Sequence, residues 1–222
     1  LDKLIKANIS TYNQQKVFIE NASHELQTPL AVLRSKIDIL LQNKDMTTEQ
    51  LNILESIEMP VSRMARINKN LLLLAKIENR QFGDISHINL SAIVEESSQL
   101  VADYIQDKEL TFGNNVARSF FVDSNTFLLE TLVNNLLINS IRHTAKGGQV
   151  TIDLEGSVLL FRNSGESPLN SETLFERFGI SSGTNVSSGL GLSIIKEICN
   201  RYQWKINYSF AGNLHCFSVD FG

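Results

Sequence analysis

Apolar residues in the first eighty positions follow a helical period. Before residue 43 they recur at spacings of three and four: Ile19, Ala22, Leu26, Leu30, Leu33, Ile37 and Leu40. After residue 47 they recur near heptad spacing: Leu51, Leu54, Met64, Ile67, Leu71, Leu74 and Ile77. This periodicity predicts two long amphipathic helices, each with one buried stripe. A polar link joins them, and Thr47 with Gln50 matches a capping box at the start of the second helix.

Two such helices form a hairpin, and a lone hairpin leaves apolar surface exposed. Pairing two hairpins into a four-helix bundle would cover that surface, so a homodimer is expected. The alternative is that the C-terminal part of the same chain covers it. Pro29 and Pro60 lie inside the two helical patterns, and each should bend its helix because proline removes a backbone donor.

The pattern becomes mixed after residues 81–89, which look like a linker. Helices are expected over residues 91–107, with Ser91 as N-cap, and over residues 124–144 and 190–202. Short strands are expected over residues 110–116, 120–122, 149–154, 158–162 and 204–210, with a last strand ending at Phe221. Residues 164–188 form a long polar stretch, typical of a lid or a disordered loop. The hairpin should therefore precede an α+β two-layer sandwich with helices over one sheet.

Composition narrows the classes of function. A chain of 222 residues with 42% hydrophobic content can hold two modest domains. Its net charge of −4 gives no basic surface for nucleic acid. The two cysteines, Cys199 and Cys216, lack metal-type spacing, which favours a reduced cytosolic setting, and Cys199 is expected in the core. No apolar run of about 18 residues exists to span a membrane.

His24 is a candidate for chemistry on the first helix. It lies two residues from both Ala22 and Leu26, so at 3.6 residues per turn it should face away from the buried stripe. Glu25 is adjacent, and Thr28, four residues on, shares its face. A lone surface histidine is usually only solvated. An exposed imidazole beside an acid and a hydroxyl is nevertheless placed for chemistry.

Residues 23–30 read S-H-E-L-Q-T-P-L, and this block resembles the phosphoacceptor box of sensor histidine kinases. Seven of the eight positions match, with Gln27 in place of the usual basic residue. The resemblance implies that His24 attacks the γ-phosphate of ATP and that Glu25 orients it and takes up its other ring proton. It also implies that Thr28 positions a water for the reverse, phosphatase reaction.

A polar stripe crosses the apolar helix expected over residues 124–144. Asn135, Asn139, Arg142 and His143 fall on one face. Such a stripe costs energy unless it is paired, and asparagine offers an oxygen to a hard cation and N–H donors to phosphate. A polar network closing the sheet edge is the alternative. Residues 135–144 resemble the N box of histidine kinases and the wider GHKL ATPases, which implies that Asn139 is the Mg²⁺ ligand and that the other three contact phosphates or ribose.

The triplet Asn163-Ser164-Gly165 follows an expected strand and resembles the first glycine box, of pattern D-x-G-x-G. Asn163 replaces the aspartate that accepts from the adenine amino group, and Ser167 replaces the second glycine. An amide oxygen still accepts such a bond, but without charge assistance. We therefore expect ATP binding to be weakened but not lost.

Two further blocks follow in the order that the family shows. Residues 174–178 resemble the F box, whose aromatics, here including Phe178, anchor a lid; a small apolar plug is the alternative. Residues 188–196 resemble the second glycine box, in which glycines let the backbone approach phosphates and a helix N-terminus offers free N–H groups. The residues of this box expected to bind the nucleotide are Gly189, Leu190, Gly191 and Leu192.

The resemblance covers essentially the whole chain. It implies a dimerisation and histidine phosphotransfer hairpin over residues 1–80, a linker over residues 81–89 and a GHKL-type catalytic ATP-binding domain over residues 90–222. The implied cofactors are ATP and Mg²⁺, and the implied partners are a second copy of the chain and the receiver domain of a response regulator. Because the chain begins inside a helical pattern, we expect the cytoplasmic part of a longer inner-membrane sensor, with any membrane spans in absent upstream segments.

Two other functions stay open. A degenerate kinase would act as a dimeric scaffold or phosphatase, a reading motivated by Asn163 and Ser167. A GHKL ATPase would instead hydrolyse ATP to drive motion. The block around His24 argues against the ATPase, and so does the lack of an acid placed to activate water, since the nearest is Glu130, five positions before Asn135.

Overall fold

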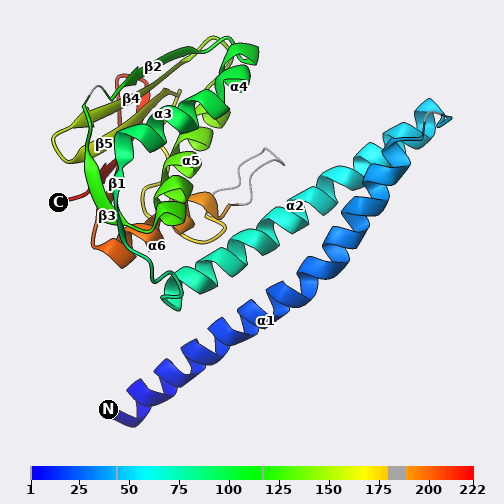
Figure 1. The fold of residues 1–222 in the computed structure, drawn as a ribbon, viewed down its shortest axis with the longest axis horizontal. Coiled ribbons are helices and arrows are strands. Elements are labelled where there is room, and N and C mark those ends of the chain that lie inside the picture. The colour runs from blue at the N-terminus through cyan, green and yellow to red at the C-terminus, as the bar shows by residue number, and fades with distance from the viewer. Residues whose placement is uncertain (1, 44, 117, 180–188) are drawn as a thin grey trace. The chain divides into compact units, whose positions relative to one another are not determined.

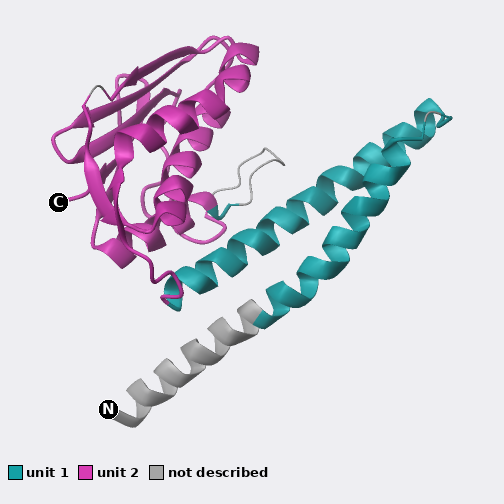
Figure 2. Ribbon diagram, in the orientation of Figure 1, with its two compact units in different colours: residues 1–79, 181–190 teal, residues 80–180, 191–222 magenta. Residues whose placement is uncertain are grey.

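The computed structural model describes residues 2–43, 45–116, 118–179 and 189–222, with side chains from residue 21 onward. The chain divides into two compact units (Figure 2). The first contains residues 1–79 and 181–190, and the second contains residues 80–180 and 191–222. Within the described ranges, no helix combines the length and the apolar character needed to cross a membrane.

The first unit is a hairpin of two long helices, as predicted. Helix α1 spans Asp2–Leu41 and helix α2 spans Thr48–Glu78, and the two pack side by side (Figure 1). The capping box is confirmed, because the Gln50 N–H donates to Thr47 Oγ1 over 3.2 Å and the Thr47 N–H donates to Gln50 Oε1 over 2.9 Å. Both helices continue through their internal prolines, and the bends expected there stay predictions.

The core of the hairpin contains fewer residues of α1 than the predicted apolar stripe. Leu30 and Ile37 of α1 are buried with Leu54 and Val61 of α2, and Met46 and Ala65 pack against them. The remaining leucines of the α1 stripe stay about half exposed: Leu26 at 51%, Leu33 at 46% and Leu40 at 49%. This confirms the expectation that a lone hairpin leaves apolar surface exposed, because a single partner helix covers only one side of the stripe.

The apolar residues of α2 are likewise divided into buried and exposed ones. Ile53, Ile57 and Met64 are 54%, 47% and 49% exposed, although Leu54 and Val61 beside them are buried. The first unit thus presents apolar rows on both helices that its own core does not use. Exposed apolar surface of this kind typically marks an interaction site.

The second unit is built on a five-stranded sheet. The strand order is β2 (Thr111–Asn115), β4 (Gln149–Glu155), β5 (Val158–Ser164), β7 (Leu214–Asp220) and β6 (Lys205–Ala211). Strand β2 is parallel to β4, and the other neighbours are antiparallel. Burial alternates along β5 and β7, so one face of the sheet enters the core. Helices α3 (Leu90–Leu100), α5 (Thr126–His143) and α6 (Gly191–Tyr202) cover it, which confirms the predicted sandwich (Figure 1).

Three local predictions need correction. Residues 86–89 of the expected linker form strand β1 (Ser86–Asn89), which pairs antiparallel with β3 (Phe121–Ser124). The N-cap of α3 is Asn89, not Ser91, because its side-chain oxygen accepts from the Ser91 N–H over 3.1 Å. The single helix expected over residues 91–107 ends at Val101, whose backbone leaves the helical region, and α4 (Ala102–Asp107) follows.

The start of α5 also shifts slightly, since Asn125 caps it by accepting from the Leu128 N–H over 3.2 Å. The long polar stretch after β5 contains turns but no α-helix or strand up to residue 179, and the rest of the expected lid, residues 180–188, lies outside the described residues. Cys199 is buried in α6, as predicted, and burial raises the pKa of its thiol to about 12.

Candidate functional site

The candidate acceptor lies on the outer side of the hairpin. His24, Glu25 and Thr28 are all exposed on α1, whereas Ser23 and Leu30 are buried. The prediction that His24 faces away from the core is confirmed. Its imidazole is therefore accessible to a second reactant.

Helix α5 carries the polar stripe of the second unit. Its apolar side is buried in the core through Leu128, Leu129, Leu132, Val133, Leu136, Leu137 and Ile141. Asn135, Asn139 and Arg142 are half-buried, and His143 is exposed at the C-terminal end. Packing of the leucine side therefore fixes the direction in which these four side chains project.

The first residue of α6 lies close to this stripe. Asn135 donates from its amide nitrogen to the carbonyl of Thr131 over 2.8 Å. Its side-chain oxygen would lie 3.0 Å from a Cβ added at Gly191, so any larger residue there would crowd it. The N box and the start of the second glycine box are thus neighbours, although they lie more than fifty residues apart in the sequence.

A lysine that the sequence analysis did not identify caps the C-terminal end of α5. Lys108 donates from its ammonium to the carbonyls of Ile141 (2.9 Å), Arg142 (3.0 Å) and Thr144 (2.7 Å). Carbonyls in the last turn of a helix have no partner within the helix, and a cation is favourable there. No local pattern marks Lys108, because it comes from the turn after α4 and meets α5 only in the folded unit.

Three basic groups therefore gather at the C-terminal end of α5. Desolvation, followed by repulsion from Arg142, lowers the pKa of Lys108. Desolvation, followed by the charges of Arg142 and Lys108, lowers the pKa of His143, which favours its neutral imidazole at pH 7. A neutral donor beside two fixed cations suits an anionic ligand such as a phosphate.

Asn163 lies at the base of the second candidate segment. It is 2% exposed on β5, on the face of the sheet that enters the core, and it pairs in register with Val150 and His215. Its amide nitrogen donates to the carbonyl of Ser164 over 3.2 Å. The position therefore holds a buried neutral amide.

Gly165 and His215 fit together closely. The Gly165 N–H donates to the carbonyl of Asn213 over 2.9 Å, which holds the glycine against the β6–β7 turn. A Cβ added at Gly165 would lie 2.0 Å from Nε2 of His215, so the imidazole occupies the space that a side chain would need. Glycine is required here by close approach, not by backbone conformation.

His215 is in turn held by Tyr208. Its Nδ1 lies 2.9 Å from Tyr208 Oη, which accepts from the Leu169 N–H over 2.9 Å. Desolvation lowers the pKa of His215, favouring a neutral ring. Sequence reasoning missed both residues. The alternating aromatics of the β6 pattern were the only signal for Tyr208, and none marked His215.

The expected F box has an exposed aromatic side chain and a buried leucine. Phe178 is 55% exposed with φ at +59°, and Leu174 is the buried residue of this segment, at 3%. In the second glycine box, Gly189 has φ at +68°, Leu190 is fully buried and Leu192 is half-buried. Gly191 begins α6, so its first N–H groups have no partner within the helix.

The described residues contain no group of three or more His, Cys, Asp or Glu placed to hold a metal ion. A cation at α5 would instead rely on an amide oxygen such as that of Asn139, together with oxygens of a ligand. Mg²⁺ suits such a site because it keeps several waters and takes few protein ligands in addition to phosphates.

Two models of known protein families match separate parts of the chain. Residues 14–80 match the model of the His Kinase A (phospho-acceptor) domain, and residues 125–220 match the model of the histidine kinase-, DNA gyrase B- and HSP90-like ATPases. The heme sensor protein HssS of Staphylococcus aureus is 32% identical over 202 residues, which cover 86% of this chain and 43% of that protein. The sensor protein kinase PmrB of Pseudomonas aeruginosa is 28% identical over 207 residues, covering 89% and 43% respectively.

Solved structures show the same fold. Full-length ShkA in complex with AMPPNP superposes with a TM-score of 0.69 at 17% identity, over 90% of this chain and 44% of that one. The histidine kinase AdeS of Acinetobacter baumannii gives a TM-score of 0.59 at 20% identity, over 88% and 95%. The two matched domains are the phospho-acceptor domain and the ATPase-type domain found in histidine kinases. The chain belongs to the sensor histidine kinases of two-component signal transduction, and it spans about 43% of the length of the two relatives named above.

Replacing Gly165 by Ala should destabilise the second unit. The added Cβ would collide with His215, and overpacking of this kind typically costs about 1–3 kcal/mol in the free energy of unfolding. Urea denaturation measures the change, and the double variant with His215→Ala should recover part of the loss. Gly83→Ala is the matched control, because a Cβ there meets nothing within 4 Å. Equal stability of the Gly165 and Gly83 variants would contradict the proposed fit.

Replacing Lys108 by Met should leave three carbonyls of α5 without their donor. Hydrogen bonds to charged groups contribute about 1.5–3 kcal/mol, so we expect a loss near that range in urea denaturation. Lys146→Met is the control, since Lys146 forms an exposed ion pair with Glu109 at 2.8 Å, and such pairs contribute little. If both lysine variants lose the same stability, Lys108 does not cap the helix.

Proposed function

We propose that this chain transfers the γ-phosphoryl group of ATP to His24 and then to an aspartate in the receiver domain of a response regulator. The observation that carries the proposal is the exposed His24 within the S-H-E-L-Q-T-P-L block of a phospho-acceptor domain, followed by an ATPase domain. Residues 1–80 would serve dimerisation and phosphotransfer, and residues 90–222 would bind ATP.

The chemistry at His24 follows from its surroundings. One ring nitrogen of the neutral imidazole attacks the γ-phosphorus, the bond from that phosphorus to the bridging oxygen breaks, and ADP leaves. Glu25 orients the ring and takes up the proton from the other nitrogen. Thr28 lies one helical turn from His24 on the same face, which supports a role in positioning water for dephosphorylation.

The nucleotide site would use the polar side of α5. Asn139 is the candidate ligand for Mg²⁺, which would neutralise phosphate charge when bound. Asn135, Arg142 and His143 would contact phosphates or ribose, and the positive charge at this end of α5 supports that role.

The remaining predicted residues would surround the two ends of the nucleotide. Asn163 and Gly165 would face the adenine, with Asn163 as a neutral acceptor. Gly189, Leu190, Gly191 and Leu192 would bring backbone N–H groups to the phosphates, supported by their place at the start of α6. Phe178 would belong to a lid, and its exposure leaves it available to contact a ligand.

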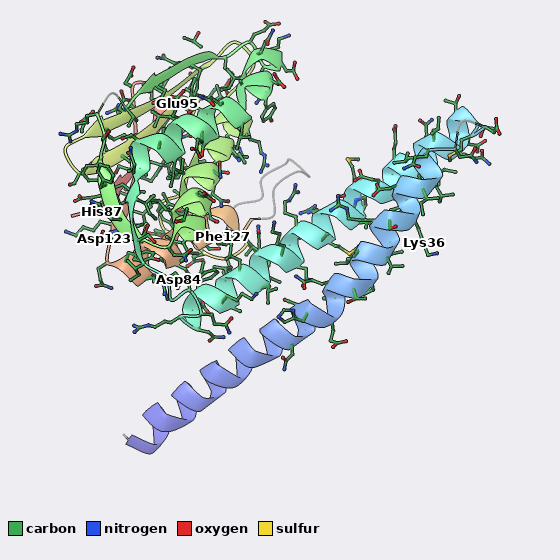
Figure 3. The ribbon with its side chains drawn as sticks, viewed as in Figure 1. Lys36, Asp84, His87, Glu95, Asp123 and Phe127 are labelled. Atoms are coloured by element: carbon green, nitrogen blue, oxygen red, sulfur yellow. The ribbon has the colours of Figure 1, made fainter. Side chains whose placement is uncertain are left out.

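Phosphoryl transfer requires the second unit to reach His24, and part of the expected linker is tied to that unit. Arg201 of α6 donates to the carbonyl of Phe82, and the Phe82 ring stacks on Phe127 with centroids 5.8 Å apart. Asn125 donates to the carbonyl of Asp84 over 3.2 Å (Figure 3 shows Asp84 and Phe127). These contacts support a pivot located before Phe82, shorter than residues 81–89.

A homodimer would cover the unused apolar rows of the hairpin. The rows comprise Leu26, Leu33, Leu40, Ile53, Ile57 and Met64, each about half exposed in the single chain. A second hairpin is the partner of matching chemistry, because it carries the same rows and closes a four-helix bundle.

Replacing Leu33 by Asp should convert the dimer to a monomer, because it puts a charge into the middle of this apolar surface. Light scattering coupled to size-exclusion chromatography measures the mass. Ser35→Asp is the control, since Ser35 is exposed on the same helix and lies almost opposite Leu33 at 100° per residue. A Leu33→Asp protein with the mass of a dimer would argue that these rows serve another purpose.

Replacing His24 by Gln should abolish incorporation of label from γ-labelled Mg-ATP, because the nucleophilic nitrogen is lost. In the wild-type chain, the label should be labile to acid and stable to alkali. His87→Gln is the control, since His87 is an exposed histidine on β1 in the other unit (Figure 3). Label retained at wild-type level in His24→Gln would exclude His24 as the acceptor. A folded wild-type dimer without any label would favour the scaffold or phosphatase, for which the neutral Asn163 is the supporting observation.

A further inference from the structure

The hairpin core changes character at the level of the candidate acceptor. Leu30 and Ile37 of α1 and Leu54 and Val61 of α2 form its apolar part. The seven-residue repeat continues with Ser23, seven residues before Leu30 in α1, and with Asn68, seven residues after Val61 in α2. Both are polar, and both are buried, at 2% and 4% exposure.

These two residues are bonded to each other. The amide nitrogen of Asn68 donates to the backbone carbonyl of Ser23 over 2.7 Å. That carbonyl belongs to the peptide group joining Ser23 to His24. A side chain from α2 therefore holds the backbone from which the His24 imidazole projects.

Stability does not explain why an asparagine lies here. A valine or leucine at the same heptad position would extend the apolar core, whereas a buried amide gains little net free energy from its hydrogen bond. A single buried polar residue in a helical seam is known instead to define register. If α1 slid along α2, the Asn68 amide would lose its acceptor, and a buried amide without a partner is disfavoured.

The local helix also needs such an anchor. Pro29 lacks an N–H, so the carbonyl of Glu25 has no partner four residues on, and the hydrogen-bond ladder is interrupted just after His24. The contact from Asn68 lies immediately before His24. The candidate acceptor His24 therefore lies between two features of α1. The backbone hydrogen bonds are interrupted after it, and the Asn68 side chain binds the backbone before it.

We propose that Asn68 is a positioning residue for phosphoryl transfer: its bond to the Ser23 carbonyl sets the register of α1 on α2 and holds His24 in the place where the γ-phosphate must meet it. The inference rests on the proposed role of His24 as acceptor. It assigns to α2 a part in the reaction without any contact to ATP.

The test replaces Asn68 by Val, which removes the donor but keeps similar size and an apolar surface. Autophosphorylation is followed in single turnover over a range of γ-labelled Mg-ATP, and unfolding by urea and the dimer mass are measured on the same samples. Misplacement of a reacting group by about 1 Å can lower rates by about 100-fold, so we expect a maximal rate about 10- to 100-fold lower. The KM for ATP should stay unchanged, because ATP binds in the other unit, and stability should be equal or higher.

Two further variants separate positioning from folding. Asn68→Gln keeps an amide donor and should recover part of the maximal rate. Leu54→Val lies two layers away in the same core and should lower the urea midpoint of unfolding while leaving the maximal rate unchanged. A dimeric Asn68→Val protein with the wild-type maximal rate would overturn the proposal, as would a loss of rate no greater than its loss of folded protein. If the wild-type chain takes no label, the proposed function fails first, and this inference fails with it.

Discussion

Both candidate sites depend on the same constraint: a helix that buries one side has no freedom to choose where its opposite side points. In α1, burial of Leu30 and Ile37 against α2 directs His24 to solvent. In α5, a leucine-rich side enters the core of the second unit, and Asn135 and Asn139 project from the other side. Burial of the apolar side of each helix thus fixes the direction of the polar side chains. Successive residues are 100° apart around the helix, so no separate contact is needed to orient them.

Polar contacts between different elements then fix the positions of side chains and backbone that apolar burial alone does not determine. Lys108 satisfies the end of α5, Asn68 holds the backbone before His24, and Tyr208 holds the imidazole that packs on Gly165. The contacts of Lys108 and Asn68 join elements 34 and 45 residues apart, whereas Tyr208 and His215 lie on neighbouring strands, seven residues apart. Buried polar groups are costly when left unpaired, so each contact admits few alternative arrangements.

The proposed phosphoryl transfer joins two units that fold around separate cores. The first presents His24, the proposed acceptor, on an exposed helix face, and the second gathers positive charge and glycine-lined backbone where a nucleotide would bind. Because the segment from Phe82 is tied to the second unit by Arg201 and Asn125, little of the chain between the units is left to act as a pivot. A short pivot restricts the paths by which the nucleotide could approach His24.

Local sequence patterns determined the two helices of the hairpin, most helices and strands of the sandwich, the capping box at Thr47 and the exposure of His24, because each depends on residues close together in the chain. The order of boxes likewise pointed to the nucleotide site. Only the tertiary structure decided which leucines of the α1 stripe are buried, since that depends on how much of the stripe one partner helix can cover. It also decided the roles of Lys108, Asn68 and His215, whose partners are brought to them by packing. A local sequence pattern predicts the direction in which a side chain points, but not which group from a distant part of the chain it contacts.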